Sequence, residues 1–386
     1  MKRVMIIPEG VVDGPVEALR ERTPLAAART PALDDLARRG RIGVANYVPP
    51  REPARPHTAL LSALGYDPRE YPVGRAWLQI AAAGADVPAD AWPLMADFVT
   101  VSHDRVREIV RDLRSAELSA LLDALNELGA ERGVRFQEME GRAVVTGFAD
   151  LLRLRAMPPD EALDQRSSRC APRGAGARTL RQFASRAAAV LMSHDINAVR
   201  RDLGENPADQ LWLWGSGPAP RMPALGERWD VGAVGIAVDP MALGAFRLAG
   251  IDVVEPNDNQ PTSLAHAAID ALHSCHLVIV YADAAQLASL AGDVFGKVAA
   301  IEAIDAELIA PVRRRLAEES QWRMLIAPTI AAEVELRCYS SESTIVCLAG
   351  HDIESSREAA FDEDHAEVGE MDIERGWELM EHFLLR

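Results

Sequence analysis

The chain has 386 residues, of which 48% are hydrophobic and 26% charged, and its formal net charge at pH 7 is −17. This length can bury a large core, predicts two domains, and carries the composition of an ordinary soluble globular protein. The strong negative charge argues against nucleic acid or an anionic membrane as a partner.

Two further features concern the cellular compartment. The four cysteines, at positions 170, 275, 338 and 347, lie far apart with no CxxC spacing, which predicts free thiols in a reducing compartment. The N-terminal KRVMIIPEG has too short an apolar run for a signal peptide, and no stretch approaches the roughly 20 apolar residues of a membrane span. We therefore expect a cytoplasmic protein.

Strand and helix signals alternate over the first 80 residues. RVMIIP predicts a buried strand that runs directly into Glu9, and RIGVANYV predicts a second strand. Between them, a helix is predicted to begin at Thr30-Pro31 and to stop at Gly40. A Pro-rich loop then precedes a helix in HTALLSALG.

The pattern changes from about Ala81. ADFVTV predicts a strand, SAELSALLDALNELGAERG an amphipathic helix, and VRFQEMEGRAVVTGF a pair of strands. A long polar loop and a long helix, TLRQFASRAAAVLMSHDINAVRRDLG, complete this block. Residues 81–204 are therefore predicted to form an inserted, smaller α/β domain.

Short apolar runs return in the last part of the chain. DQLWLWGSG, VGAVGIAV, GIDVVEP, CHLVIVYAD, RMLIAP and STIVCLAG are typical of strands that are buried on both faces. Together with residues 1–80, residues 205–386 predict an α/β core domain with a doubly wound, mostly parallel sheet.

Several blocks of the sequence resemble the archaeal-type, 2,3-bisphosphoglycerate-independent phosphoglycerate mutases of the alkaline phosphatase superfamily. They run in the family's order from IIPEGVVDGPVEAL through LSALGYDPREYPVGRAWLQIAAAG and NPADQLWLWGSG to GDVFGKVAAIEAID and GWELMEHFLL. The resemblance implies an alkaline-phosphatase-like core and the glycolytic interconversion of 2- and 3-phosphoglycerate. It also implies a serine nucleophile and two divalent metals, usually manganese, which suit in-line phosphoryl transfer.

The positions that carry this chemistry in the family are mostly different here. Glu9 stands where the family has its first Asp ligand, and Pro56 falls at the position of the serine. Proline has no hydroxyl group, so it cannot attack phosphorus. The other ligand positions of the family are occupied by Gln286, Leu290, Thr329, Ile330 and Tyr339. Glu9 alone keeps a metal-competent carboxylate, and we expect it to cap the next turn or to pair with an arginine.

Some groups that could bind substrate are retained. Arg75 is kept, Arg200 and Arg201 stand near basic positions of the family, and His194 matches a family histidine. His194 is open to a second interpretation, a hydrogen-bonded packing role. His57 and Thr58, next to the serine position, are candidates for relocated chemistry, although Thr58 also fits a helix cap.

These observations favour a non-catalytic homologue with a binding or regulatory role. No cofactor is expected, and the ligand would be a small acidic metabolite or a protein partner. One alternative is an active mutase or phosphohydrolase that uses relocated groups, namely Glu9, His57, Thr58 and Asp283. Another is a structural subunit of an oligomer, formed either by copies of this chain or together with an active paralogue.

Overall fold

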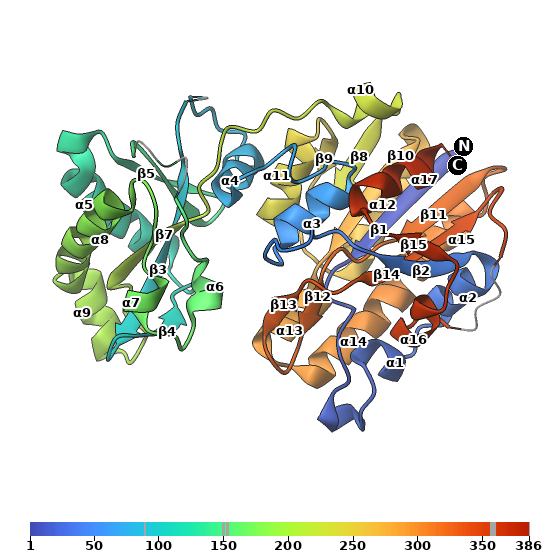
Figure 1. The fold of residues 1–386 in the computed structure, drawn as a ribbon, viewed down its shortest axis with the longest axis horizontal. Helices are drawn as coiled ribbons and strands as arrows, with labels where there is room; N and C mark the ends of the chain where they lie inside the picture. The colour runs from blue at the N-terminus through green and yellow to red at the C-terminus, as the bar shows by residue number, and fades with distance from the viewer. Residues whose placement is uncertain (89, 149–150, 152–153, 356–359, 386) are drawn as a thin grey trace. The chain divides into compact units, whose positions relative to one another are not determined.

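A computed structural model describes residues 1–88, 90–148, 151, 154–355 and 360–385. The chain divides into two compact units, which Figure 1 shows as ribbons. The core unit comprises Met1–Tyr71 and Met222–Arg386, and the inserted unit comprises Pro72–Arg221.

These boundaries differ from the predicted ones at 80/81 and 204/205, and the cause lies in two elements. Helix α4 (Arg75–Ala82) contacts strands β3 (Leu94–Ser102) and β6 (Arg142–Thr146) of the inserted unit. Strand β7 (Gln210–Trp214), which was expected in the core sheet, pairs with β3 in antiparallel register. An apolar strand does not reveal from its own pattern which of two sheets it joins.

The core unit is built on an eight-stranded sheet with the order β15-β2-β14-β11-β1-β10-β8-β9. Strand β14 is antiparallel to both its neighbours, and the other pairs are parallel. The predicted α/β class with a mostly parallel sheet is therefore confirmed. The bounds are β1 Lys2–Pro8, β2 Arg41–Ala45, β8 Ala233–Ile236, β9 Asp252–Val254, β10 Leu277–Ala282, β11 Trp322–Ile326, β14 Thr344–Gly350 and β15 Met371–Ile373.

Strand β1 lies in the middle of this sheet and is buried on both faces. Val4 and Ile6 belong to one large apolar cluster, while Met5 and Ile7, on the opposite face, are also fully buried. Helices therefore cover both faces, as Figure 1 shows. They are α1 Pro24–Ala27, α2 Pro31–Arg39, α3 Pro56–Ala63, α10 Leu225–Trp229, α11 Pro240–Leu248, α12 Pro261–Ser274, α13 Ala284–Ala291, α14 Val294–Ala303, α15 Ala310–Leu316, α16 Glu363–Glu367 and α17 Leu379–Leu384. A short hairpin of β12 (Ala331–Glu333) and β13 (Cys338–Ser340) follows β11.

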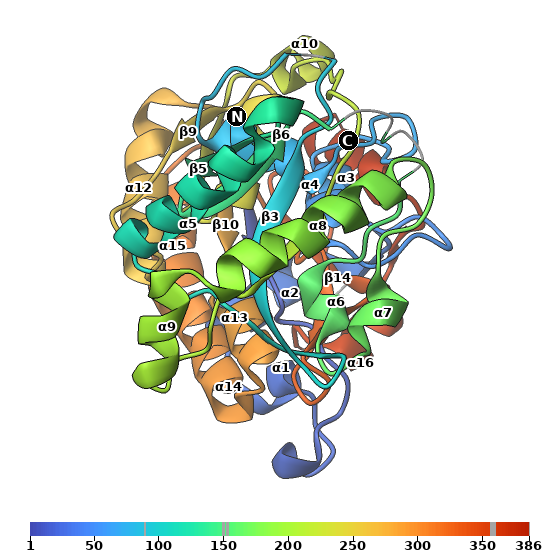
Figure 2. The ribbon, with the colours of Figure 1, turned by 90° about the vertical axis from the view of Figure 1, so that its left-hand side faces the viewer.

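The inserted unit has an antiparallel sheet in which β3 pairs with β4 (Arg105–Ile109), β6 and β7, and β6 also pairs with β5 (Arg135–Met139). Helices α5 (Ser115–Gly129) and α8 (Ala177–Met192) lie across one face of it, as Figure 2 shows, and enclose an apolar cluster around Phe183.

Two predictions for this unit need refinement. The long polar loop contains two short helices, α6 (Pro159–Ala162) and α7 (Ser167–Cys170). The long helix is two helices, because α8 ends before His194 and α9 (Asp195–Asp202) begins after it. All four cysteines are free thiols. In the described part of the chain, no helix has both the length and the apolar character needed to cross a membrane.

Candidate functional site

The candidate site lies where the central parallel strands of the core unit end. Strand β1 pairs in parallel with β10 and β11, so the carboxyl ends of all three strands meet at one edge of the sheet. Glu9 follows β1 directly, and its backbone N–H donates to the carbonyl of Ala282 at 2.8 Å. Asp283 follows β10, and the turn Pro328-Thr329-Ile330 follows β11.

The Glu9 carboxylate is 0% exposed and holds this turn. One of its oxygens, Oε2, accepts hydrogen bonds from the backbone N–H groups of Thr329 at 3.1 Å and Ile330 at 3.2 Å. The other oxygen accepts a hydrogen bond from the hydroxyl of Thr329. Glu9 thus caps a turn, although it is the turn after β11 and not the one after its own strand.

Burial changes the acidity of this edge. Desolvation raises the pKa of Glu9 to about 7, although its three hydrogen bonds lower the pKa in part. Burial, together with the charge of Asp239 after β8, raises the pKa of Asp283 to about 6. The amide of Asn259 donates to Asp283 and opposes this rise. Two carboxyl groups with raised pKa values therefore lie at neighbouring strand ends.

Gln286, in the first turn of α13, is bonded to two tyrosines. The Tyr281 hydroxyl donates to its Oε1 at 3.4 Å, and its Nε2 donates to the Tyr339 hydroxyl at 3.1 Å. The close approach of this helix to β1 depends on Gly10, which has φ +74°, because a Cβ there would lie 2.4 Å from the Cα of Gln286. Leu290 lies one turn further along α13 and is half-buried.

Pro56, His57 and Thr58 form the first turn of α3. Proline is well suited to this position, since the first N–H groups of a helix have no partner within the helix. His57 is buried, and Thr58 is half-buried at the third helical position. Their suggested catalytic role stays a prediction.

The predicted substrate-binding residues all belong to the inserted unit. Arg200 is 1% exposed, and its guanidinium lies 2.7 Å from Asp112, 3.3 Å from Glu117 and 3.2 Å from Glu205. Its charge is therefore already balanced by carboxylates inside the unit.

The other three also have local partners. Arg201 donates to the carbonyl of Met192 at 3.1 Å, and Arg75 donates to the side chain of Gln79 at 3.2 Å. The Nδ1 of His194 accepts the N–H of Ile196 at 3.2 Å, which makes His194 the N-cap of α9. A role of these residues toward substrate stays a prediction.

Comparisons with known proteins identify the family. The sequence profile described as 2,3-bisphosphoglycerate-independent phosphoglycerate mutase matches residues 37–197. The mutase of that name from Methanothrix thermoacetophila is 33% identical, with 96% of each chain covered, and that from Methanosarcina mazei is 30% identical, with 98% covered. The chain belongs to this phosphoglycerate mutase family.

Solved structures agree on the fold. The PH0037 protein from Pyrococcus horikoshii superposes with a TM-score of 0.79 at 25% identity, over 99% of this chain and 96% of the other. The cofactor-independent phosphoglycerate mutase from Thermoplasma acidophilum gives a TM-score of 0.61 at 22% identity, over 99% of both chains. The chain therefore shares the fold of these solved structures, whose α/β class the sequence predicted.

Family membership corrects one expectation. The prediction that the chain takes no cofactor is wrong, because this mutase family uses divalent metals and the Methanothrix thermoacetophila relative covers 96% of the chain.

The donor set nevertheless does not fit a pair of metals. Leu290 and Ile330 have no donor atom, and Gln286 is already bonded to two tyrosines. Among the described residues, no group of three or more His, Cys, Asp or Glu side chains could hold a metal ion. No chemical step is therefore assigned to a metal at these residues.

Of the seven positions compared with the family, the structure brings together Glu9, Gln286, Thr329, Ile330 and Tyr339.

Two buried residues near these positions, Lys297 and Tyr47, were not singled out from the sequence. Lys297 is 0% exposed, and its Nζ donates to Asp13 at 2.7 Å and to the carbonyl of Ala332 at 2.8 Å.

Tyr47 is the second missed feature. It is buried, its hydroxyl has no hydrogen-bond partner among the described residues, and burial with the nearby Glu9 charge raises its pKa. No sequence signal pointed to Tyr47. For Lys297 there was one signal, because it is one of only two lysines in the chain.

Proposed function

We propose that this chain does not interconvert 2- and 3-phosphoglycerate by a serine-centred reaction and acts instead as a binding or regulatory protein. The observation that supports this most is Pro56. At the position where the resemblance places the nucleophile, the first residue of α3 has no hydroxyl. The ligand class we propose remains a small acidic metabolite or a protein partner.

The contacts of Glu9 and Gln286 support the same proposal. A carboxylate that accepts two backbone N–H groups and a hydroxyl has its lone pairs directed into the protein. The Gln286 amide links Tyr281 to Tyr339 in a similar way. Both groups stabilise the strand ends, so the edge is built as a hydrogen-bonded structure.

A mutase assay tests this proposal. The purified full chain would be loaded with manganese, its metal content measured by mass spectrometry, and 3-phosphoglycerate supplied with enolase to detect 2-phosphoglycerate. The Methanosarcina mazei relative serves as the positive control. We expect no turnover above the blank at any metal content, and measurable turnover by the purified chain would overturn the proposal.

A second candidate is an enzyme with relocated groups, and the acidity of the strand ends favours it. Carboxyl groups with pKa values raised to about 7 (Glu9) and about 6 (Asp283) are suited to general acid–base work near neutral pH. Phosphohydrolase activity toward phosphoesters, lost in Asp283→Asn or Thr58→Ala, would support it. Thr262→Ala, an exposed threonine at the start of α12, is the matched control. Copurification with an active mutase would instead assign a subunit role.

A further inference from the structure

The inserted unit contains a cavity of about 290 Å³ between β7, α8 and the segment 156–172. Its walls are largely apolar and include Met157, Leu180, Ala184, Leu211 and Leu213. Pockets for small molecules measure about 300–1,000 Å³ and combine apolar walls with a few polar groups. The cavity is at the lower end of this range, so its occupant would be small.

One of the residues that line this cavity is positively charged. Arg181 lies on α8, one turn before Ala184, and both residues line the cavity. The guanidinium of Arg181 is exposed and donates to the carbonyl of Pro172 at 3.3 Å. Arginine has several N–H donors, so one such bond leaves others available for an anion.

The surrounding segment is strongly basic although the chain is acidic. Residues 165–181 contain five arginines and no aspartate or glutamate, whereas the chain as a whole has a net charge of −17. All five are exposed, and in the described part of the chain none forms an ion pair with a carboxylate. They are Arg166, Arg169, Arg173, Arg178 and Arg181.

Several carboxylates border this segment. Asp160 and Asp164, directly before it in the chain, form ion pairs with Arg111 and Arg107. Asp104 accepts hydrogen bonds from the hydroxyls of Ser167 and Ser168, both at 2.8 Å, and these bonds and the charge of Arg166 lower its pKa. The Asp104 carboxylate is therefore bonded to residues of the loop itself. The local balance at the cavity stays positive, and a positive rim attracts an anion.

We propose that this cavity binds a small organic anion with an apolar body, whose apolar part lies between α8 and β7 and whose anionic head meets Arg181. Apolar walls exclude a fully polar ligand such as a phosphorylated sugar acid. The arginines exclude a cation. The site lies wholly within the inserted unit and does not depend on the function proposed for the strand ends.

Calorimetry on the full chain with octanoate as the probe tests this site. The apolar body is tested separately with 1-octanol, and the anionic head with inorganic phosphate. We expect octanoate to bind at least fivefold more tightly than 1-octanol, and phosphate to give no measurable heat. The octanoate affinity should fall as sodium chloride is raised, because the rim is exposed to solvent.

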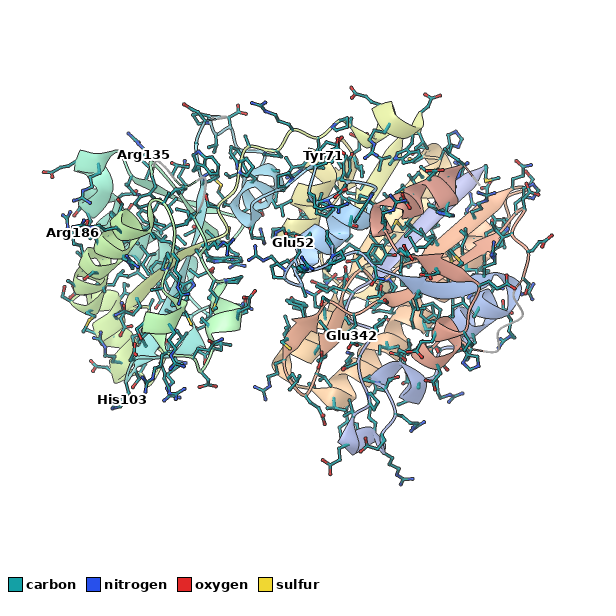
Figure 3. All side chains as sticks on the ribbon, viewed as in Figure 1. Glu52, Tyr71, His103, Arg135, Arg186 and Glu342 are labelled. Atoms are coloured by element: carbon teal, nitrogen blue, oxygen red, sulfur yellow. The ribbon has the colours of Figure 1, made fainter. Side chains whose placement is uncertain are left out.

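Three variants locate the site. Arg181→Gln should weaken octanoate binding about tenfold, the usual scale for one charge-assisted hydrogen bond. Arg186→Gln is the matched control, because Arg186, labelled in Figure 3, is exposed on the same helix but does not line the cavity. Ala184→Phe should fill the cavity and abolish binding, with circular dichroism to show that the variant folds.

Three outcomes would overturn the proposal. One is the absence of octanoate binding at millimolar concentration. Another is an equal loss of affinity in Arg181→Gln and Arg186→Gln, which would indicate a diffuse charge effect. The third is unchanged binding in a folded Ala184→Phe protein, which would place the ligand elsewhere. If Ala184→Phe does not fold, the comparison of the two arginine variants decides the matter.

Discussion

Replacing Glu9 by glutamine should remove a defined part of the pH dependence of stability. The pKa of Glu9 is raised from 4.5 to about 7 by burial at the end of β1. A carboxyl group with a raised pKa binds its proton more tightly in the folded state than in the unfolded state. Its contribution to stability is therefore complete below pH 4.5 and is lost as the pH rises through 7.

The size of this contribution follows from the shift. One pKa unit corresponds to about 1.4 kcal/mol, so a shift from 4.5 to about 7 corresponds to roughly 3 kcal/mol. Glutamine does not titrate, and the Glu9→Gln variant should lack this loss. At low pH the parent carboxyl is protonated and, like the amide, presents one carbonyl oxygen to these donors, so the variant should differ from the parent there by only about 1 kcal/mol.

The assay is urea unfolding of both proteins at intervals from pH 4 to pH 8.5. The difference in the free energy of unfolding between parent and variant isolates Glu9, since the other titrating groups are common to both. Glu363→Gln is a second test of the same effect at a different place, on α16. Burial also raises the pKa of Glu363 to about 7, so its difference curve should change over the same pH interval.

The outcome is decisive in either direction. The difference curve should change by roughly 3 kcal/mol across the interval between the two pKa values. A difference that stays constant within about 0.5 kcal/mol would show that the folded-state pKa of Glu9 is close to its ordinary value. The conclusion that desolvation of Glu9 outweighs its three hydrogen bonds would then be refuted.

Three further substitutions test the packing of the two units. Lys297→Met should lower the free energy of unfolding by about 3–5 kcal/mol, because it leaves the Asp13 carboxylate buried without its cation; urea unfolding measures the loss, and a second change, Asp13→Asn, should recover part of it. Arg200→Met should cost less for the inserted unit, about 1–3 kcal/mol, since Glu117 keeps its ion pair with Arg114; a free energy of unfolding equal to that of the parent would contradict this. Phe183→Ala should cost about 3–5 kcal/mol and lower the melting temperature, because the ring is fully buried between α8 and the sheet; a melting temperature equal to that of the parent would be the contrary result.

Several elements of this fold can be predicted from local pattern alone. RVMIIP has an uninterrupted apolar run, and a strand that is buried on both faces requires one. The helix at Pro31–Arg39 has its proline in the first turn and a glycine at its end. The resemblance located the strand-end residues Glu9, Gln286, Thr329 and Tyr339, which do lie together.

Other elements depended on contacts that a local pattern does not contain. QLWLW reads as a strand in either sheet, and only its pairing with β3 assigns it to the inserted unit. The long helix after position 177 was not divided, although His194 caps a new helix there through its side chain. Arg200, near a basic position of the family, was predicted to bind substrate, yet three carboxylates surround it in the folded chain.

The sequence by itself determined the family, the α/β class and the residues at the ends of the strands, because apolar periodicity and ordered motif blocks are properties of the chain. Tertiary structure alone decided what those residues do. Glu9 lies at a strand end, where a carboxylate could bind a metal. Its oxygens instead accept hydrogen bonds from a turn some 320 residues away in the sequence. Its pKa and its partners depend on burial and on that distant turn, so they arise only when the chain folds.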